Sequence, residues 1–114
     1  MRRLDLLLPQ GMEQTAREAS YNVSTFASRC GVSRRTVGTF IRRRFGIAPH
    51  DWMLQLRMTE ASRLLREGMY VKEVSASLAF KQASAFCRAF KHFHGLTPHE
   101  YLMVQNVRLA AKAI

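Results

Sequence analysis

Hydrophobic residues recur at helical spacing along this chain, and two segments repeat the same order of hydrophobic and polar positions. The first segment is residues 23–49, VSTFASRCGVSRRTVGTFIRRRFGIAP, and the second is residues 71–98, VKEVSASLAFKQASAFCRAFKHFHGLTP. In each, a short amphipathic helix precedes a turn and a second helix that carries Arg or Lys. Two short helices joined by a tight turn are typical of a helix-turn-helix motif, so the pattern predicts two such motifs in tandem.

The two copies correspond residue by residue on either side of their turns, with one extra residue in the second turn. The matched hydrophobic positions are Val23 with Val71, Phe26 with Val74, Cys30 with Leu78, Val37 with Phe86 and Ile41 with Phe90. This correspondence predicts that the two copies fold alike. Two basic helices on one small body can enter neighbouring major grooves of DNA.

Capping residues set the expected limits of the first motif, residues 23–45. The side-chain oxygens of Asn22 and Ser33 can each accept hydrogen bonds from the exposed N–H groups at a helix start. Gly31, between the two helices, suits a tight turn that a β-branched or bulky residue would resist. The expected helices are therefore residues 23–29 and 34–45.

The rest of the chain is also expected to be helical, with no strand pattern. A connector helix over residues 50–67 has broad apolar faces, and we expect its Trp52 to lie in the core. The second motif, residues 71–94, ends where Gly95 stops its basic helix. The sequence thus predicts an all-α fold of two helix-turn-helix lobes joined by a long connector. The expected flanking segments are a lead-in over residues 1–10, a helix over 12–20 and a tail over 103–114.

The charge balance favours a polyanionic partner. The formal net charge is +10, from 18 Lys and Arg against 8 Asp and Glu, in only 114 residues. A field of this sign favours nucleic acid and fast, salt-sensitive association; the alternative is a basic surface without a partner. The chain is expected to be one domain, or two very small lobes that share a helix. No run approaches the roughly 18 apolar residues of a membrane span, so we expect a cytoplasmic, nucleoid-associated protein.

Metal sites and catalytic motifs are not indicated. The cysteines, Cys30 and Cys87, lack CxxC spacing, and His92 and His94 are two residues apart, on different faces of a helix. Exposed histidines near phosphates are the expected interpretation of the four histidines. A nucleophile elbow, a phosphate-binding loop and paired carboxylates are also missing from the sequence. We therefore expect no metal, no cofactor and no enzymatic activity.

The ordered set of segments resembles the DNA-binding domain of the AraC/XylS family of bacterial transcription regulators. The resemblance is carried by VSTFASRCGVSRRTV, by FGIAPHDWMLQLRMTEASRLL with its Arg57-to-Ala61 spacing, and by LAFKQASAFCRAFKHFHGLTPHEY. It implies a bilobed domain of about seven helices over residues 11–102. In this family, a central helix holds two recognition helices toward successive major grooves. The usual activity is activation of transcription through contact with RNA polymerase.

The length of the chain bears on how such a domain would work. Many family members carry a separate effector-binding or dimerisation domain, for which 114 residues leave no room. The chain is similar either to short stand-alone members or to the carboxy-terminal half of a longer regulator. The resemblance implies double-stranded DNA and RNA polymerase as partners, and tandem motifs allow binding as a monomer.

The resemblance also implies which residues read bases. On the first recognition helix these are Arg35, Gly38 and Thr39, whose spacing places them on one face. Arg35 can donate two hydrogen bonds to guanine O6 and N7, and Thr39 can contact a thymine methyl. Gly38 implies either sparse readout or a close approach of the backbone to the groove. The matching positions of the second helix are Ala83, Ser84, Cys87 and Arg88, among which Arg88 is the strongest candidate.

Cations around the two helices are expected to contact phosphates: Arg34, Arg42, Arg43, Lys81 and Lys91. Arginines near a helix C-terminus also complement its dipole, although the run at residues 42–44 exceeds that need. Ser84 is expected either to bond DNA or to cap its helix. Arg57, within the connector, is expected to brace the lobes by pairing with Glu60 or a carbonyl.

The second turn departs from the family pattern. Ala79 stands where glycine is usual, and Gln82 stands where an acidic or small capping residue is usual. An alanine held at positive φ costs about 1 kcal/mol. We therefore expect the second motif to be less stable or less sequence-selective than the first.

Two other functions are compatible with the sequence. A protein-interaction module would need an exposed apolar patch, which four methionines could supply, although methionines at helical spacing more often fill cores. These are Met53, Met58, Met69 and Met103. A nonspecific nucleoid-type DNA-binding protein would bind with an affinity independent of base sequence.

Overall fold

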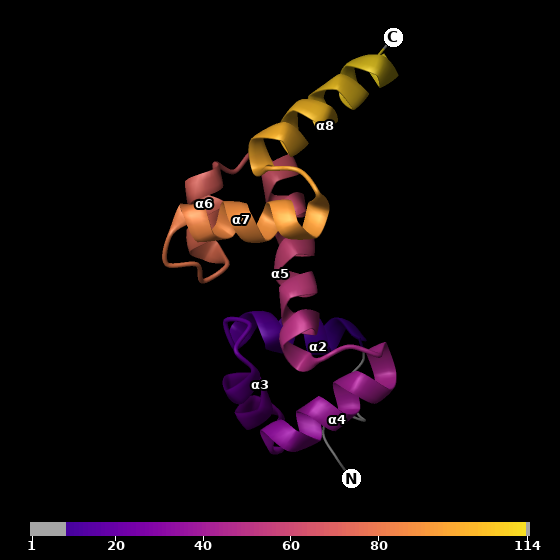
Figure 1. The fold of residues 1–114 in the computed structure, drawn as a ribbon, viewed down its shortest axis with the longest axis vertical. Helices are drawn as coiled ribbons and strands as arrows, with labels where there is room; N and C mark the ends of the chain where they lie inside the picture. The colour runs from indigo at the N-terminus through magenta and orange to yellow at the C-terminus, as the bar shows by residue number, and fades with distance from the viewer. Residues whose placement is uncertain (1–8, 114) are drawn as a thin grey trace. The chain divides into compact units, whose positions relative to one another are not determined.

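The computed structural model describes the backbone of residues 9–113 and the side chains of residues 11–106. Within residues 9–113 there are seven helices and no strand, which confirms the predicted all-α fold (Figure 1). The helices are α2 (Pro9–Glu18), α3 (Val23–Cys30), α4 (Arg34–Phe45), α5 (Pro49–Arg66), α6 (Val71–Ser77), α7 (Ala83–His94) and α8 (Pro98–Ala113).

The chain divides into two compact units, and the division falls inside α5. The first unit extends to Arg57 and the second begins at Met58. Each unit contains one helix-turn-helix motif, α3 with α4 in the first and α6 with α7 in the second. The two ends of α5 thus belong to different cores.

An aromatic contact organises the core of the first unit. The Trp52 ring is buried, and it meets the Phe26 ring edge-on with 5.5 Å between centroids. Its other neighbour is the Phe45 ring, stacked at 5.7 Å. Because these three rings come from α5, α3 and α4, their contact holds the start of α5 against both helices of the motif. The other fully buried large side chains of this unit are Met12, Val37, Ile41 and Met53.

Helix α2 has different limits from those predicted. It begins at Pro9, inside the expected lead-in, because proline is tolerated in the first helical turn, where its missing N–H would be unpaired in any case. Residues 1–8 of that lead-in lie outside the described residues. Helix α2 ends before Ser20 and Tyr21, which have φ angles of 52° and 59° and therefore leave the right-handed helical region.

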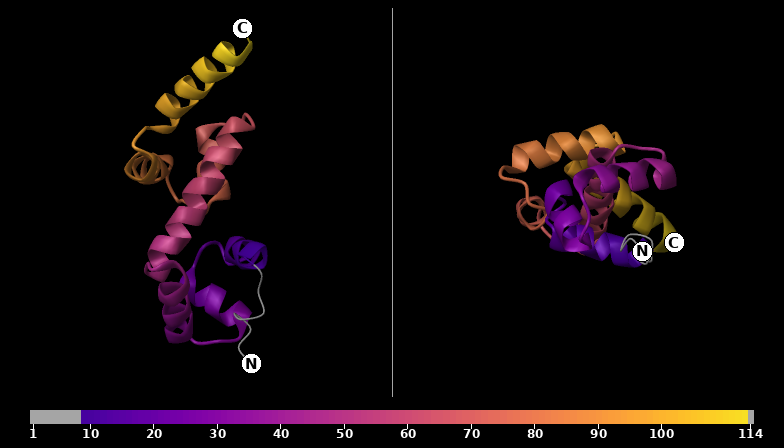
Figure 2. Two further views of the ribbon diagram at one scale, coloured as in Figure 1. Left: turned by 90° about the vertical axis from the view of Figure 1, so that its right-hand side faces the viewer. Right: turned by 90° about the horizontal axis from the view of Figure 1, so that it is seen from below.

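Aromatic rings also form the core of the second unit. Phe86 and Phe90 of α7 are fully buried with 5.8 Å between ring centroids, and Tyr101 of α8 meets Phe90 edge-on at 5.5 Å. His94 ends α7 with its Nε2 atom 2.9 Å from the backbone carbonyl oxygen of Met58. This hydrogen bond ties α7 to α5. The predicted tail is the continuation of α8, whose last turns project away from α7 (Figure 2).

The two motif turns share a left-handed residue at the matching position but differ in length and in side-chain chemistry. Gly31 has φ 71° and the corresponding Ala79 has φ 66°, so both are left-handed. Ser33 caps α4, since its Oγ accepts a hydrogen bond from Thr36 N at 3.1 Å, whereas Gln82 makes no side-chain cap bond at the start of α7. The second turn therefore has a strained alanine and lacks a side-chain cap.

We predict that Ala79→Gly stabilises the second unit by about 0.5 kcal/mol, because removal of a strained β-carbon outweighs the added freedom of the unfolded chain. Thermal or urea unfolding followed by circular dichroism measures the change. A matched control is Ala76→Gly, on the exposed side of α6, which should destabilise by about 1 kcal/mol. Destabilisation by both substitutions would show that the turn at residue 79 is not strained.

Candidate nucleic-acid interface

Helix α4 separates an apolar face from a basic one. Val37 and Ile41, one turn apart, are completely buried in the first unit. This burial fixes the rotation of the helix, so that its cations project into solvent. The exposed cations are Arg34, Arg35, Arg42, Arg43 and Arg44.

The cations of α4 have few compensating partners in the free protein. Arg44 lies over the Phe45 ring, with its guanidinium carbon 5.8 Å from the ring centroid. The side chains of Arg34, Arg35, Arg42 and Arg43 form no hydrogen bond or ion pair to another described residue. Their donors are therefore available to acceptors outside the chain.

A hollow of about 500 Å³ opens on this basic face. Its lining comes from the start of α3, the exposed side of α4 and the first turn of α5. The lining residues are Val23, Arg34, Arg35, Gly38, Thr39, Arg42, Ala48, Pro49 and His50. No acid is among them, so the hollow is suited to an anion or to the acceptor-rich edge of a base. His50, one of the four histidines expected to lie exposed near phosphates, is exposed and lines this hollow.

The predicted base-facing residues of α4 occupy different environments. Arg35 is exposed and Thr39 is half-buried, and both line the hollow. Gly38 is buried. A β-carbon at residue 38 would lie 3.0 Å from Nη1 of Arg42 and 3.8 Å from Cγ of Pro49. The guanidinium of Arg42 thus covers Gly38.

Helix α7 presents fewer cations than α4. Ser84 and Arg88 are exposed and Cys87 is half-buried, on the side of the helix away from buried Phe86 and Phe90. Ser84 does not cap the helix, since Gln82 holds that position and accepts a hydrogen bond from Ser84 Oγ at 3.4 Å. The neighbouring cations, Lys81 and Lys91, are also exposed.

Arg57 has a packing role within the first unit. Its guanidinium carbon lies 5.8 Å from the centroid of the Tyr21 ring, and partial burial lowers its pKa. The carboxylate of Glu60, one partner that the sequence suggested, accepts a hydrogen bond from Nε of Arg63 at 3.1 Å. The contact with Tyr21 was missed because it joins α5 to the turn between α2 and α3, which is distant in sequence.

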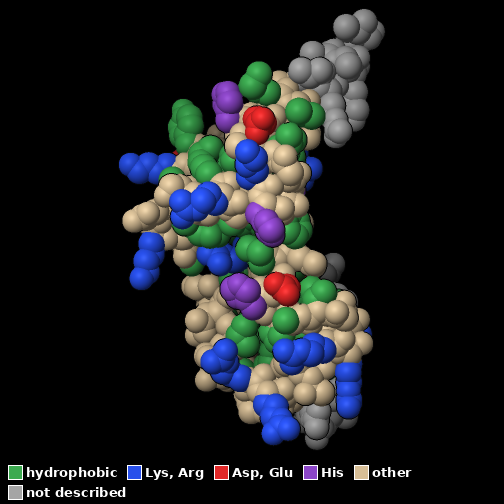
Figure 3. Space-filling view, viewed as in Figure 1, with side chains coloured by type: hydrophobic (Ala, Val, Ile, Leu, Met, Phe, Trp, Pro, Cys, Tyr) green, Lys and Arg blue, Asp and Glu red, His purple; other side chains and the backbone are tan. Residues whose placement is uncertain are grey.

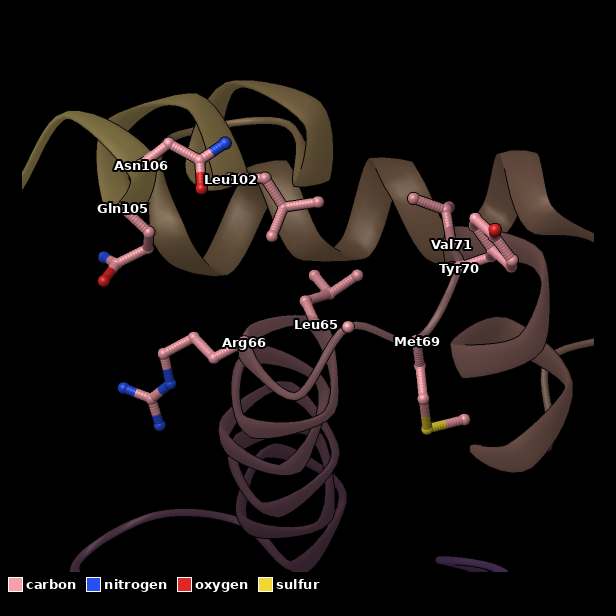
Figure 4. Close-up of a pocket in the computed structure, with 9 residues that line it drawn as sticks. Leu65, Arg66, Met69, Tyr70, Val71, Leu102, Gln105 and Asn106 are labelled. Atoms are coloured by element: carbon pink, nitrogen blue, oxygen red, sulfur yellow. The ribbon is translucent and has the colours of Figure 1, made fainter. Parts of the chain in front are cut away.

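A second hollow, of about 540 Å³, lies in the second unit and has an apolar floor. Leu65 at the end of α5 and Leu102 of α8 point toward one another across it (Figure 4). Arg66, Gln105 and Asn106 also line it, but apolar groups make up most of the lining, which does not suit a phosphate backbone. It is therefore separate in chemistry from the basic hollow of the first unit.

The surface view agrees with the charge balance, since Lys and Arg dominate the charged side chains on the face shown in Figure 3. Among the described residues, no three His, Cys, Asp or Glu side chains lie close enough to hold a metal ion. None of the described helices is both long and apolar enough to cross a membrane.

Two curated relatives are named as transcription regulators. The chain is 32% identical over 91 residues to the transcriptional activator NphR of Rhodococcus sp, and the match covers 79% of this chain and 27% of NphR. It is 30% identical over 83 residues to an AraC-like transcription regulator of Streptomyces lividans, a match covering 72% of this chain and 27% of the relative. The chain thus spans less than a third of the length of each relative.

Two crystal structures have the same fold. The C-terminal domain of the two-component response regulator yesN from Fusobacterium nucleatum superimposes with a TM-score of 0.68 at 24% identity, covering 79% of this chain and 88% of that domain. A transcriptional regulator with an AraC-type DNA-binding domain from Chromobacterium violaceum gives a TM-score of 0.64 at 21% identity, covering 81% of this chain and 92% of the other.

The family follows from a match over most of the two motifs. Residues 26–103 match the family described as helix-turn-helix domain, a range that begins within α3 and ends in α8. The match therefore includes both recognition helices and the whole of α5. With the shared fold and the AraC-like relative, it places this chain in the AraC-type helix-turn-helix domain family.

Proposed function

We propose that this chain is the DNA-binding part of a transcription regulator and that it inserts α4 and α7 into successive major grooves. The observation that carries the proposal is the basic hollow of α4, whose arginines lack partners among the described residues. The family and fold are those of DNA-binding regulators, so the chain is not an enzyme. The domain that we assign to this function covers residues 11–102, with the motifs at 23–45 and 71–94 and the connector at 50–67.

In this proposal, base contacts select the site. Arg35 donates to a guanine and Thr39 contacts a thymine methyl in the first groove, while Arg88 donates to a guanine in the second. Exposure of Arg35 and Arg88 supports these roles, because each guanidinium can reach outward from its helix. Ser84 and Cys87 lie near Arg88 on the outer side of α7, and their shorter side chains make additional contacts with DNA.

Phosphate contacts anchor the domain without choosing the sequence. We assign this role to Arg34 and Arg43 around α4 and to Lys81 and Lys91 around α7, since all four are exposed. Each such contact releases counterions from DNA, so affinity falls as the salt concentration rises. The excess of positive charge over the whole chain favours the same partner.

We further propose that the regulator is an activator that contacts RNA polymerase, as the name of the NphR relative supports. Tandem motifs allow one copy of the domain to occupy a complete site, so binding as a monomer is expected. Such a regulator would act in the cytoplasm, at the nucleoid.

Fewer methionines are available for an exposed patch than a protein-interaction module would need. Met53 and Met58 are buried, as expected of core residues, and cannot belong to an exposed patch. Met103 is 56% exposed, and Met69 lines the apolar hollow of the second unit. This hollow leaves room for a protein contact in addition to DNA binding.

We predict that the wild-type chain, selected against a random double-stranded DNA pool at about 150 mM salt, enriches two short sequence blocks about ten base pairs apart. An Arg35→Ala, Arg88→Ala double variant should enrich neither block, because both two-pronged donors are gone. A control with the same loss of charge, Arg29→Ala with Arg66→Ala, should keep both blocks. Enrichment of one block would limit specific readout to one helix. Binding without any enrichment would indicate a nonspecific DNA-binding protein.

We predict that Arg43→Ala lowers affinity to a similar degree for specific and unrelated DNA. The slope of log affinity against log salt concentration should fall by about 1, as expected for one lost phosphate contact. Fluorescence anisotropy titrations at several salt concentrations measure both quantities. Arg66→Ala, which also removes an exposed arginine, should leave the slope unchanged. Equal slopes for the wild type, Arg43→Ala and Arg66→Ala would show that Arg43 does not contact a phosphate.

A further inference from the structure

The side chain of Arg42 occupies the place that residue 38 would fill if it carried a side chain. In an α-helix, side chains lean toward the N-terminus, so a residue covers the turn before its own Cα. Nη1 of Arg42 lies 3.0 Å from the position of a β-carbon on Gly38, so a side chain there would push the guanidinium outward by a few tenths of an ångström. The absence of a side chain at Gly38 therefore lets the guanidinium of Arg42 lie directly against the helix.

The guanidinium of Arg42 lies among the positions of α4 that are proposed to face bases. Residue 38 falls between Arg35 and Thr39 in the sequence, and all three residues line the basic hollow together with Arg42. The guanidinium of Arg42 is thus held beside the residues proposed to read bases. It can present two parallel N–H donors there, as guanine O6 and N7 require.

The positive charges of the hollow favour an external acceptor. Arg34, Arg35 and Arg42 line the same hollow, and a bound acceptor would relieve the repulsion between these like charges. The side chain of Arg42 makes no hydrogen bond or ion pair with another described residue. Its guanidinium therefore lies against Gly38 without a bond to an acidic neighbour.

We infer that Arg42 reads a base pair in the groove occupied by α4, and that Gly38 is the positioning residue that leaves room for its guanidinium. This rests on the proposed function and revises the assignment of Arg42 to a phosphate. Gly38 then has a role that requires no contact between its own backbone and DNA. The base pair is one with a guanine, because the guanidinium fork matches the two acceptors on its major-groove edge.

The second motif lacks this arrangement. Cys87 corresponds to Gly38 and is half-buried, and Lys91 corresponds to Arg42 and is exposed. Cys87 carries a β-carbon and a sulfur atom where Gly38 leaves a space. Lysine offers a single charged point in place of a fork. An additional base-contacting arginine at this position is therefore specific to α4.

The test compares Arg42→Lys with Arg66→Lys on the DNA site that the wild type selects and on single-base variants of it. Lysine preserves the charge at both positions and removes the planar fork. Arg42→Lys should lose about tenfold discrimination at one guanine-containing pair, and Arg66→Lys, at an exposed arginine outside the proposed interface, should leave every position unchanged. A uniform loss across all sequences with Arg42→Lys would make Arg42 a phosphate contact and overturn the inference.

A second measurement tests Gly38 itself. Gly38→Ala should raise Tm by about 4 °C, because alanine favours the helix, and yet lose discrimination at the same base pair as Arg42→Lys. In an Arg42→Ala background, Gly38→Ala should have no further effect on binding, since the two residues act as one unit. Independent effects in that cycle would overturn the positioning role. If the wild type selects no DNA site at all, the proposed function fails; a site that Arg42 and Gly38 do not affect contradicts the inference alone.

Discussion

Burial of one face of each recognition helix is the constraint on which the candidate interface depends. Val37 with Ile41 in α4, and Phe86 with Phe90 in α7, are completely enclosed one helical turn apart. Each such side chain contributes roughly 1.5–3 kcal/mol when it leaves water. Rotation of either helix about its axis would expose both members of its pair, so the polar residues on the opposite face are held toward solvent. The orientation of the side chains proposed to face DNA thus follows from the core.

Local signals in the sequence predicted most of the fold. The limits of α4 follow from Ser33 and from the glycine after Phe45, and both signals act within one or two turns of the chain. The beginning of α2 was missed because a proline can either precede a helix or start one. The paths of long side chains were missed for another reason. Arg42 over Gly38, and Arg57 beside Tyr21, depend on rotamers and on neighbouring helices that spacing does not specify.

The two units have the same fold but differ in their turn residues, helix caps, charges and ring contacts. The first has glycine in its turn, a serine cap and a cluster of arginines. The second combines an alanine at φ 66° with a helix that lacks a side-chain cap, and it has a longer run of ring contacts. Phe80 lies 5.5 Å from Phe86, and the chain of rings continues through Phe90 to Tyr101. Aromatic pairs of this kind contribute about 0.5–1.5 kcal/mol beyond the area that they bury.

The uncompensated arginines of α4 have a consequence for how the protein behaves in solution. Their mutual repulsion opposes folding of the first unit, and added salt weakens that repulsion. Salt should therefore strengthen the free protein while it weakens the complex with DNA. A bound polyanion removes the same repulsion, so nucleic acid acts as a folding ligand as well as a target. Cellular nucleic acid should co-purify with the protein at low ionic strength. Once the nucleic acid is removed, the protein should be most stable at high salt concentration.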